Sequence, residues 1–280
     1  MALSKKKRND LIKAILLHLV LIIAAAAMVI PFLWMISTSL KRPREIYVWP
    51  PTLLPHEIFW SNYLKSWSAA PFGRFYINSL FIALSVTGGQ LITCTFAAYA
   101  FARLNFRGRD LIFIAFLATM MIPFQVSMIG AFQVIYWLGW ADSYYALIVP
   151  GLASPFGVFL LRQFFLTLPV ELEDAARIDG ASRLGVIRHV IVPLSTPALA
   201  TLGIFTFMGV WNDFLWPLVV LNSEQHYTVQ LGLAIFRDSH STVWNLLMAG
   251  TVSATLPILI VFFFAQRYFI RGIALTGLKG

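Results

Sequence analysis

The side chains that could carry out chemistry are few and are spread along the chain. The five histidines, at positions 18, 56, 189, 226 and 240, include no pair at the i, i+4 spacing of a helical metal site. Cys94 is the single cysteine and lies in an apolar run, so no disulfide or cysteine-based metal site can form. The chain also has no Gly-x-x-x-x-Gly-Lys-Ser/Thr phosphate loop. We therefore expect no catalytic residue, no metal and no cofactor bound by this chain.

Charges of both signs cluster between positions 171 and 188, where four acids and three arginines occur. Pro169 and the acids that follow it suit the positive N-terminal end of a helix, and Gly180 can end that helix. A small apolar face would come from Leu172, Ala175, Ala176 and Ile178. This pattern predicts a short helix that contacts another surface, although a solvated connector helix fits the same residues.

Composition places the chain in a lipid bilayer. Its 280 residues are 59% hydrophobic and 12% charged, with a mean hydropathy of +0.77, whereas soluble domains carry about 25% charged residues. The apolar runs are continuous rather than alternating, which favours helices over a β-barrel. We expect an all-α integral membrane protein with six transmembrane helices, at 14–36, 76–101, 111–135, 144–165, 197–220 and 244–266.

The positive charges set the direction of these spans. An even number of spans leaves both termini on one side, and if that side is the cytoplasm it collects 15 of the 21 Lys and Arg residues. The basic residues flank apolar runs rather than forming one stripe, so a nucleic-acid partner is not expected. Residues 1–13 and 267–280 are thus predicted to be cytoplasmic and 37–75 to form an external loop. The core would then span 76–266 and include a cytoplasmic loop at 166–196.

That cytoplasmic loop resembles the EAA loop of permeases of ATP-binding cassette importers. The family pattern is Glu-Ala-Ala, three residues, Gly, nine residues and an Ile-x-Leu-Pro ending. Here it runs Asp174-Ala175-Ala176, then Gly180, then Val190-Ile191-Val192-Pro193. The spacing fits throughout, but the acid is Asp174 rather than Glu, and Val replaces Ile and Leu at the ending.

The resemblance extends over nearly the whole chain. The segments "TSLKRPREI", "TFMGVWNDFLWPLVVL" and "QRYFIRGIALTGLKG" are similar to the second permease subunit of carbohydrate importers. This likeness implies a type I importer permease fold with a MetI-like core in a bacterial inner or cytoplasmic membrane. It also implies half of a pathway for a sugar, an oligosaccharide or glycerol-3-phosphate. The implied partners are a homologous permease, two ATPase subunits that bind ATP and Mg²⁺, and an extracytoplasmic solute-binding protein.

In such importers the loop is a coupling helix that docks in a cleft of the ATPase. The resemblance gives this role here to Glu173, Asp174, Ala175, Ala176, Asp179, Gly180 and Pro193. We favour Asp174 as the docking carboxylate, because Glu173 could replace it only if the helix rotated.

Polar residues within the spans are candidates for lining the pathway, because burying them in lipid is costly. We single out Gln125, Trp211, Asn212 and Asp213, since sugars need hydrogen-bond partners and aromatic faces. Each such polar residue also has a structural alternative: Gln90 could bridge helices, and Asn78 and Asp213 could lie at the outer membrane interface. Pro150, Gly151, Pro155 and Gly157 are expected to bend the fourth span.

Two other functions are weighed against this one. A permease for an amino acid, a peptide or phosphate would carry the same loop. An ion-coupled secondary transporter would show two similar halves and paired membrane carboxylates, whereas Asp213 is the one acid expected within a span and no internal repeat is seen.

Overall fold

The computed structural model describes residues 5–237 and 242–277, which are almost entirely helical. No strand longer than an isolated Arg237–Thr242 bridge occurs in these ranges. The chain divides into two compact units, residues 1–70 with 233–254 and residues 71–232 with 255–280. The α-helices are α1 (Lys5–Ser39), α2 (Pro43–Ile46), α3 (Ser61–Ser68), α4 (Phe72–Arg103), α5 (Arg109–Ala118), α6 (Phe124–Trp137), α7 (Tyr144–Gly151), α8 (Pro155–Leu166), α9 (Glu171–Ile178), α10 (Arg183–Val186), α11 (Val192–Leu194), α12 (Thr196–Asn212), α13 (Leu215–Val220), α14 (Val229–Leu233) and α15 (Trp244–Gly277).

Four helical segments of the described chain are long and apolar enough to cross a membrane, namely Leu11–Ser39, Phe72–Arg103, Tyr144–Leu166 and Trp244–Phe264. Two bent helix pairs, Arg109–Met121 with Phe124–Trp137 and Arg183–Leu194 with Thr196–Asn212, pass the same test together. Counting each pair once gives up to six spans, which is the number that the sequence predicts. Five of them coincide with the predicted apolar runs. The last bent pair overlaps the run at 197–220 only through Thr196–Asn212, because Arg183–Leu194 lies in the loop predicted to be cytoplasmic.

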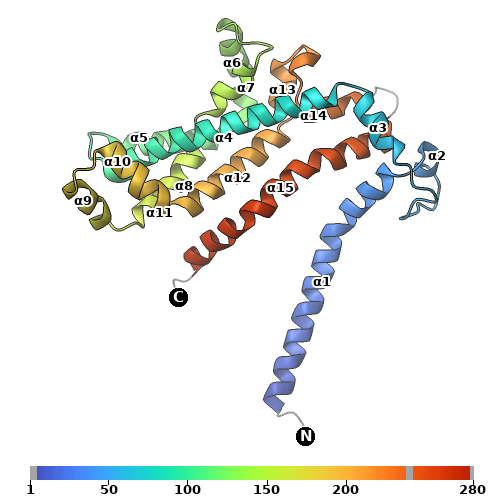
Figure 1. Ribbon diagram of the computed structural model, residues 1–280, viewed down its shortest axis with the longest axis horizontal. Coiled ribbons are helices and arrows are strands. Elements are labelled where there is room, and N and C mark those ends of the chain that lie inside the picture. The colour runs from blue at the N-terminus through green and yellow to red at the C-terminus, as the bar shows by residue number, and fades with distance from the viewer. Residues whose placement is uncertain (1–4, 238–241, 278–280) are drawn as a thin grey trace. The chain divides into compact units, whose positions relative to one another are not determined.

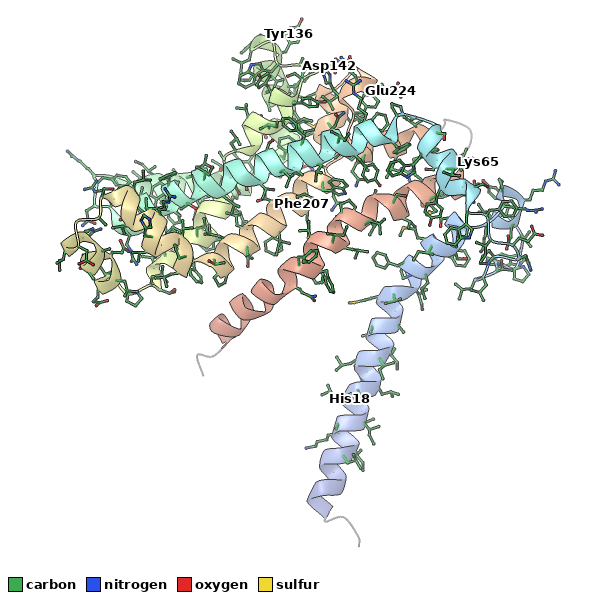
Figure 2. All side chains as sticks on the ribbon, in the orientation of Figure 1. His18, Lys65, Tyr136, Asp142, Phe207 and Glu224 are labelled. Carbon is green, nitrogen blue, oxygen red and sulfur yellow. The ribbon has the colours of Figure 1, made fainter. Side chains whose placement is uncertain are left out.

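In the first unit, α1 presents apolar side chains around its whole circumference. None of its apolar window is buried within the described chain, and Figure 2 shows side chains pointing outward along the helix around His18. A helix that is apolar on all sides requires a lipid or protein environment.

The segment that follows α1, predicted as an external loop, folds around one buried amide. The Asn62 side chain, on α3, donates to the backbone carbonyls of Ser39 (2.9 Å) and Lys41 (2.8 Å) and accepts a bond from Asn245 (3.1 Å). Arg42 pairs with Glu57 across the same segment. These contacts hold the turns on either side of α2 in an ordered cap.

In the second unit, α4, α8 and α12 lie side by side (Figure 1). Their buried faces form one apolar cluster that includes Cys94, Leu161 and Leu202. A Cβ atom on Gly157 would lie 2.8 Å from the Cys94 sulfur and 3.0 Å from Leu202. Glycine therefore allows α8 to approach both neighbours closely, as small residues do in membrane helices.

The fourth span is broken at residues 152–154, between α7 and α8, as its proline and glycine residues predict. Three side chains of α4 satisfy the carbonyls that the break frees. Gln90 donates to the Gly151 carbonyl (2.7 Å), Thr93 to that of Leu152, and Cys94 to that of Ser154 (3.6 Å). Such internal bonding is required wherever a helix breaks within a bilayer. Gln90 also accepts a bond from Thr206 (2.8 Å), which confirms its alternative role as a bridge between helices.

The third and fifth predicted spans are not the continuous helices expected from their apolar runs. Residues 109–121 meet α6 at 103°, because Pro123 holds Ile122 in an extended conformation (φ −88°, ψ 115°). The fifth run is helical over α12, leaves the helix at Asp213 and Phe214, and resumes as α13. The chain also turns by 81° between α11 and α12.

Candidate functional site

Helix α9 forms where the acidic segment predicts it, and it ends in the way that Gly180 allows. Gly180 has φ +86° and donates its N–H to the Arg177 carbonyl (3.0 Å), while Ala181 donates to the Ala176 carbonyl (2.9 Å). This bond pair is the Schellman motif, which reverses the chain at a left-handed residue. The acids at 171, 173 and 174 lie in the first turn, near the positive end of the helix dipole.

The two neighbouring carboxylates of α9 lie on different faces of the helix. Glu173 is 1% exposed and forms an ion pair with Arg103, at the end of α4. The side chain of Asp174 is 57% exposed and pairs with Arg177 of its own helix (3.1 Å). Asp174 is thus available to another protein, whereas Glu173 is engaged within this chain.

The remaining predicted coupling residues also divide into two groups. Ala175, Asp179 and Gly180 are exposed, and Ile178 beside them is 87% exposed. Ala176 is partly buried against the apolar cluster of the second unit. The outward face of α9 therefore combines a carboxylate with small and apolar side chains, a composition suited to docking in a cleft.

Pro193 lies on α11, away from the outward face of α9. It follows a single π-helical turn, Ile187–Ile191, and precedes the 81° turn into α12. Proline lacks the N–H that would continue the regular helical bonding pattern, and π turns and kinks occur at such positions. Its carbonyl accepts a bond from the Thr196 hydroxyl (2.8 Å). Pro193 thus shapes the path from the loop into the fifth span.

A second candidate site is a cavity of about 390 Å³ within the second unit, which brings together two of the predicted pathway residues. Gln125 and Asp213 both line it, with Thr228 as a third polar side chain and Phe124 and Trp216 as aromatic neighbours. Asp213 accepts a bond from the Trp216 backbone N–H (3.3 Å), at the start of α13. The break between α12 and α13 places this carboxylate at the cavity.

Trp211 and Asn212 do not line that cavity. Trp211 is 1% exposed and stacks on Phe207 (ring centroids 5.8 Å apart). It borders a separate groove of about 750 Å³, whose lining is almost entirely apolar. Asn212 donates to the Met208 carbonyl (2.9 Å) and accepts a bond from Gln230 (3.4 Å). The structure thus places Trp211 in the core and Asn212 beside α14.

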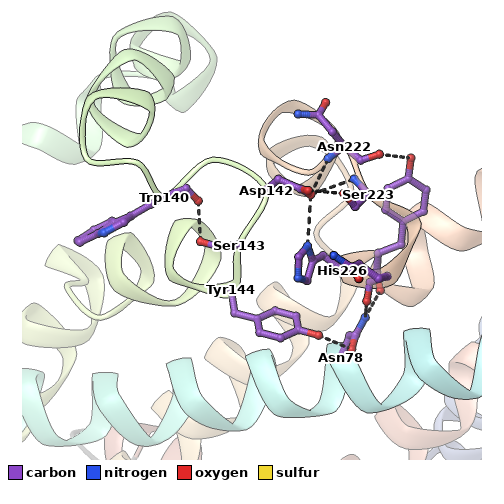
Figure 3. Close-up of polar contacts among 10 residues, drawn as sticks. Asn78, Trp140, Asp142, Ser143, Tyr144, Asn222, Ser223 and His226 are labelled. Carbon is purple, nitrogen blue, oxygen red and sulfur yellow. Dashed lines mark hydrogen bonds and ion pairs between the residues drawn. The ribbon is translucent and has the colours of Figure 1, made fainter.

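Sequence reasoning missed a loop cluster centred on Asp142, which Figure 3 shows. Asp142 accepts bonds from the backbone N–H groups of Asn222 and Ser223 (both 2.9 Å), from the Ser223 hydroxyl, and from the His226 ring (3.4 Å). Desolvation raises the pKa of the Asp142 carboxyl, but the bonds from Ser223, Asn222 and His226 outweigh it and hold the pKa well below its ordinary value. No sequence signal links positions 80 residues apart.

The cluster continues inward to α4. Tyr144 donates to the Asn78 side chain (2.7 Å), which in turn donates to the carbonyls of Gln225 (3.0 Å) and Tyr227 (2.9 Å). Asn78 therefore links α4 to Tyr144 and to the loop at 225–227 through its side-chain amide. Among the described residues, no three His, Cys, Asp or Glu side chains are close enough to hold a metal ion.

Comparison with known proteins supplies a family. The family model described as "Binding-protein-dependent transport system inner membrane component" matches residues 90–275. The arabinooligosaccharides transport system permease protein AraQ of Halalkalibacterium halodurans is 35% identical over 278 residues, which cover 98% of this chain and all of that protein. The sn-glycerol-3-phosphate transport system permease protein UgpE of Pectobacterium atrosepticum is 36% identical over 265 residues, covering 91% of this chain and 94% of that protein.

Solved structures agree with the family match. A chain of a bacterial ABC transporter involved in the import of the acidic polysaccharide alginate matches with a TM-score of 0.83 and 25% identity, over 96% of this chain and 99% of that one. A chain of a bacterial alginate ABC transporter, in complex with an alginate pentasaccharide-bound periplasmic protein, shares the fold with a TM-score of 0.62, 13% identity and coverage of 92% and 93%.

Proposed function

The chain belongs to the family of binding-protein-dependent transport system inner membrane components, and from this premise we propose that it is a permease subunit of an ATP-driven carbohydrate importer. Its relatives support the solute class, since they carry the names of arabinooligosaccharide and sn-glycerol-3-phosphate permeases and match nearly the full length of the chain. The solute we propose is a sugar, an oligosaccharide or a glycerol phosphate.

The observation that carries the coupling role is the outward face of α9. It presents Asp174 and Ile178 to the surroundings while the helix itself is anchored to α4. An exposed carboxylate beside exposed apolar side chains would dock in a cleft of an ATPase subunit that offers a cation. Asp174, Ala175 and Asp179 would make the contact, Gly180 and Pro193 would aim it, and Ala176 would pack the helix against the core.

The partners follow from this assignment. A homologous permease would supply the other half of the pathway, two ATPase subunits would bind ATP and Mg²⁺ and hydrolyse the ATP, and an extracytoplasmic binding protein would deliver the solute. This chain has no phosphate loop of the Gly-x-x-x-x-Gly-Lys-Ser/Thr type, which fits a division of labour in which hydrolysis belongs to the partner. Both termini and α9 would lie in the cytoplasm, as the positive-inside rule favours.

For the pathway, we propose that Gln125 and Asp213 contact the solute or the water that accompanies it. Their cavity also contains the Thr228 hydroxyl and the aromatic side chains of Phe124 and Trp216. Hydroxyl-rich solutes are bound by amide, carboxylate and hydroxyl groups together with aromatic faces.

Copurification tests the proposed assembly. The tagged chain, extracted from its own host in a mild detergent, should retain a second permease and an ATPase, identified by mass spectrometry. The purified chain alone should neither hydrolyse ATP nor transport solute. Solute uptake by the isolated chain in liposomes would refute the proposal and favour a secondary transporter.

A further inference from the structure

The carboxylate of Glu173 is the meeting point of three side chains at the junction of α4 and α9. Arg103 donates its Nε–H to Oε1, the Tyr99 hydroxyl donates to Oε2 (3.3 Å), and Arg177 places Nη2 3.6 Å from Oε2. Two of these groups come from the last turns of α4, and the third comes from the next turn of α9. The buried negative charge is thus paired with Arg103, 70 positions away in sequence, and with Arg177 of its own helix.

Arg103 extends this contact to the linker before α9. Its Nη2 donates to the Leu168 carbonyl (2.8 Å), between α8 and α9, and its side chain is 8% exposed. Tyr99 belongs to the apolar cluster that packs α4 against α8. The end of α4 is therefore held in place by packing against α8 and by the bond from Arg103 to the linker. Hydrogen bonds from a buried, charged group such as Arg103 are stronger than neutral bonds at the surface.

The position of Glu173 separates it from the docking face. Consecutive residues of an α-helix point about 100° apart, so Glu173 can be buried against α4 while Asp174 stays exposed on the neighbouring face. Glu173 faces α4, while Asp174 shares the exposed side of the helix with Ile178. The two carboxylates accordingly serve different purposes.

We propose that Glu173 is a positioning residue that ties α9 to the end of α4 through Arg103 and Tyr99, so that a displacement of α9 moves α4 with it. This inference rests on the proposed function, in which α9 docks on an ATPase. Packed elements joined in this way move as units between discrete arrangements. Without the tether, α9 would still dock through Asp174 but would shift without carrying the span.

Hydrogen exchange measures the tether without any ATPase. In the detergent-solubilised full chain, Glu173→Gln should make the α9 amides exchange about tenfold faster. The carboxylate that accepts the bonds from Arg103 and Tyr99 is then a neutral amide, so local opening of α9 is suppressed less. Glu171→Gln is the matched control, since it makes the same change on an exposed residue of the same helix, and α9 exchange should stay near wild type. Equal α9 exchange in the wild type and Glu173→Gln would overturn the tether.

Coupling is measured in the complex copurified with its ATPase. Glu173→Gln should retain the ATPase and its rate of ATP hydrolysis, but the solute imported per ATP hydrolysed should fall by about fivefold or more. Asp174→Asn should instead reduce ATPase retention. An unchanged import ratio in Glu173→Gln, or a retention loss equal to that of Asp174→Asn, would overturn the inference. Failure of the wild-type chain to retain any ATPase would refute the proposed function instead. The hydrogen-exchange comparison would still test the tether, because it needs no ATPase.

A double variant separates coupling from folding. Arg103→Gln combined with Glu173→Gln removes both charges, so no uncompensated ion remains buried. It should restore the yield of assembled complex if either single variant lowers it, while the import ratio stays low. Recovery of the full import ratio in the double variant would show that Glu173 only stabilises the fold.

Discussion

At the scale of single residues, the division between Asp174 and Glu173 decides what α9 can do. Asp174→Ala should lower ATPase retention about tenfold to a hundredfold, because it leaves the partner's cation without the carboxylate that it pairs with. Asp174→Glu keeps the charge and should stay near wild type. The measurement is the amount of ATPase that copurifies per permease. Full ATPase retention in Asp174→Ala would contradict the docking role and indicate that α9 is a solvated connector helix.

Glycine at position 157 is required by the packing of α8. Gly157→Ala should cost about 1–3 kcal/mol of stability, since the new methyl would overlap Cys94 and Leu202, which lie in a packed core. Gly209→Ala on α12 is the control, because a Cβ there meets nothing within 4 Å. Thermal unfolding in detergent compares the two variants, and equal midpoints would contradict the close approach of these helices.

Some residue roles could be read from the sequence and others could not. Gly180 was predictable because a left-handed helix end favours glycine, and Gln90 because a buried amide in a span needs partners. The inward turn of Glu173 was not predictable, since the rotation of an eight-residue helix is set by its partners Arg103 and Tyr99 on α4. Gln125 and Asp213 were identified as polar residues, but nothing local in the sequence places them at one cavity.

At the scale of elements, the helix end at Gly180 sets the direction of α9. Its φ of +86° is strained for any residue with a β-carbon, and a β-branched residue is disfavoured most. Gly180→Val should therefore reduce binding-protein-stimulated ATP hydrolysis more than Gly180→Ala does, although open space surrounds the position. Equal hydrolysis in both variants and the wild type would show that the end of α9 is not critical.

The loop before α7 is fastened to the loop after α13 by Asp142, and this contact should depend on pH. A carboxyl whose pKa is depressed in the folded state contributes stability above its unfolded pKa of about 3.9 and loses it as the pH falls toward its folded value. Asp142→Asn should cost about 1–2 kcal/mol at neutral pH, and it suits the test because Asn, like Asp, tolerates the left-handed φ of 56°.

Hydrogen exchange in the segment 220–227 would report the loss. Exchange there should quicken in the wild type as the pH is lowered below about 4, after correction for the intrinsic rate, and should be fast at all pH values in Asp142→Asn. Identical protection of this segment in the variant and the wild type would contradict the role of Asp142.

The sequence predicts where the membrane helices occur, but it does not predict all of their breaks or how sharply they turn. The apolar runs specify where the chain crosses the bilayer, since about 20 such residues span it. Pro123 and the residues at 213–214 interrupt two of those runs, and only a packed neighbour decides whether an interruption becomes a kink or a turn of 103°. The break at 152–154 depends in the same way on donors supplied by α4.

At the scale of the whole molecule, the proposed orientation puts α9 and both termini in the cytoplasm. Leu54→Cys and Leu184→Cys form a matched pair for labelling in a Cys94→Ser background, because the replaced side chains are 76% and 61% exposed. In intact cells or spheroplasts, an impermeant thiol reagent should label position 54 and spare position 184 until the membrane is opened. The reverse pattern would invert the topology.

The most direct test of the central claim is solute uptake by the complex reconstituted in liposomes. Labelled arabinooligosaccharides, sn-glycerol-3-phosphate and alginate oligosaccharides are offered together with the cognate binding protein. At least one should accumulate, only when ATP and the ATPase are present on the α9 side, and accumulation should fall in Asp174→Ala in proportion to the ATPase lost. Accumulation that persists without ATP, or that follows an imposed ion gradient, would contradict an ATP-driven importer coupled through α9.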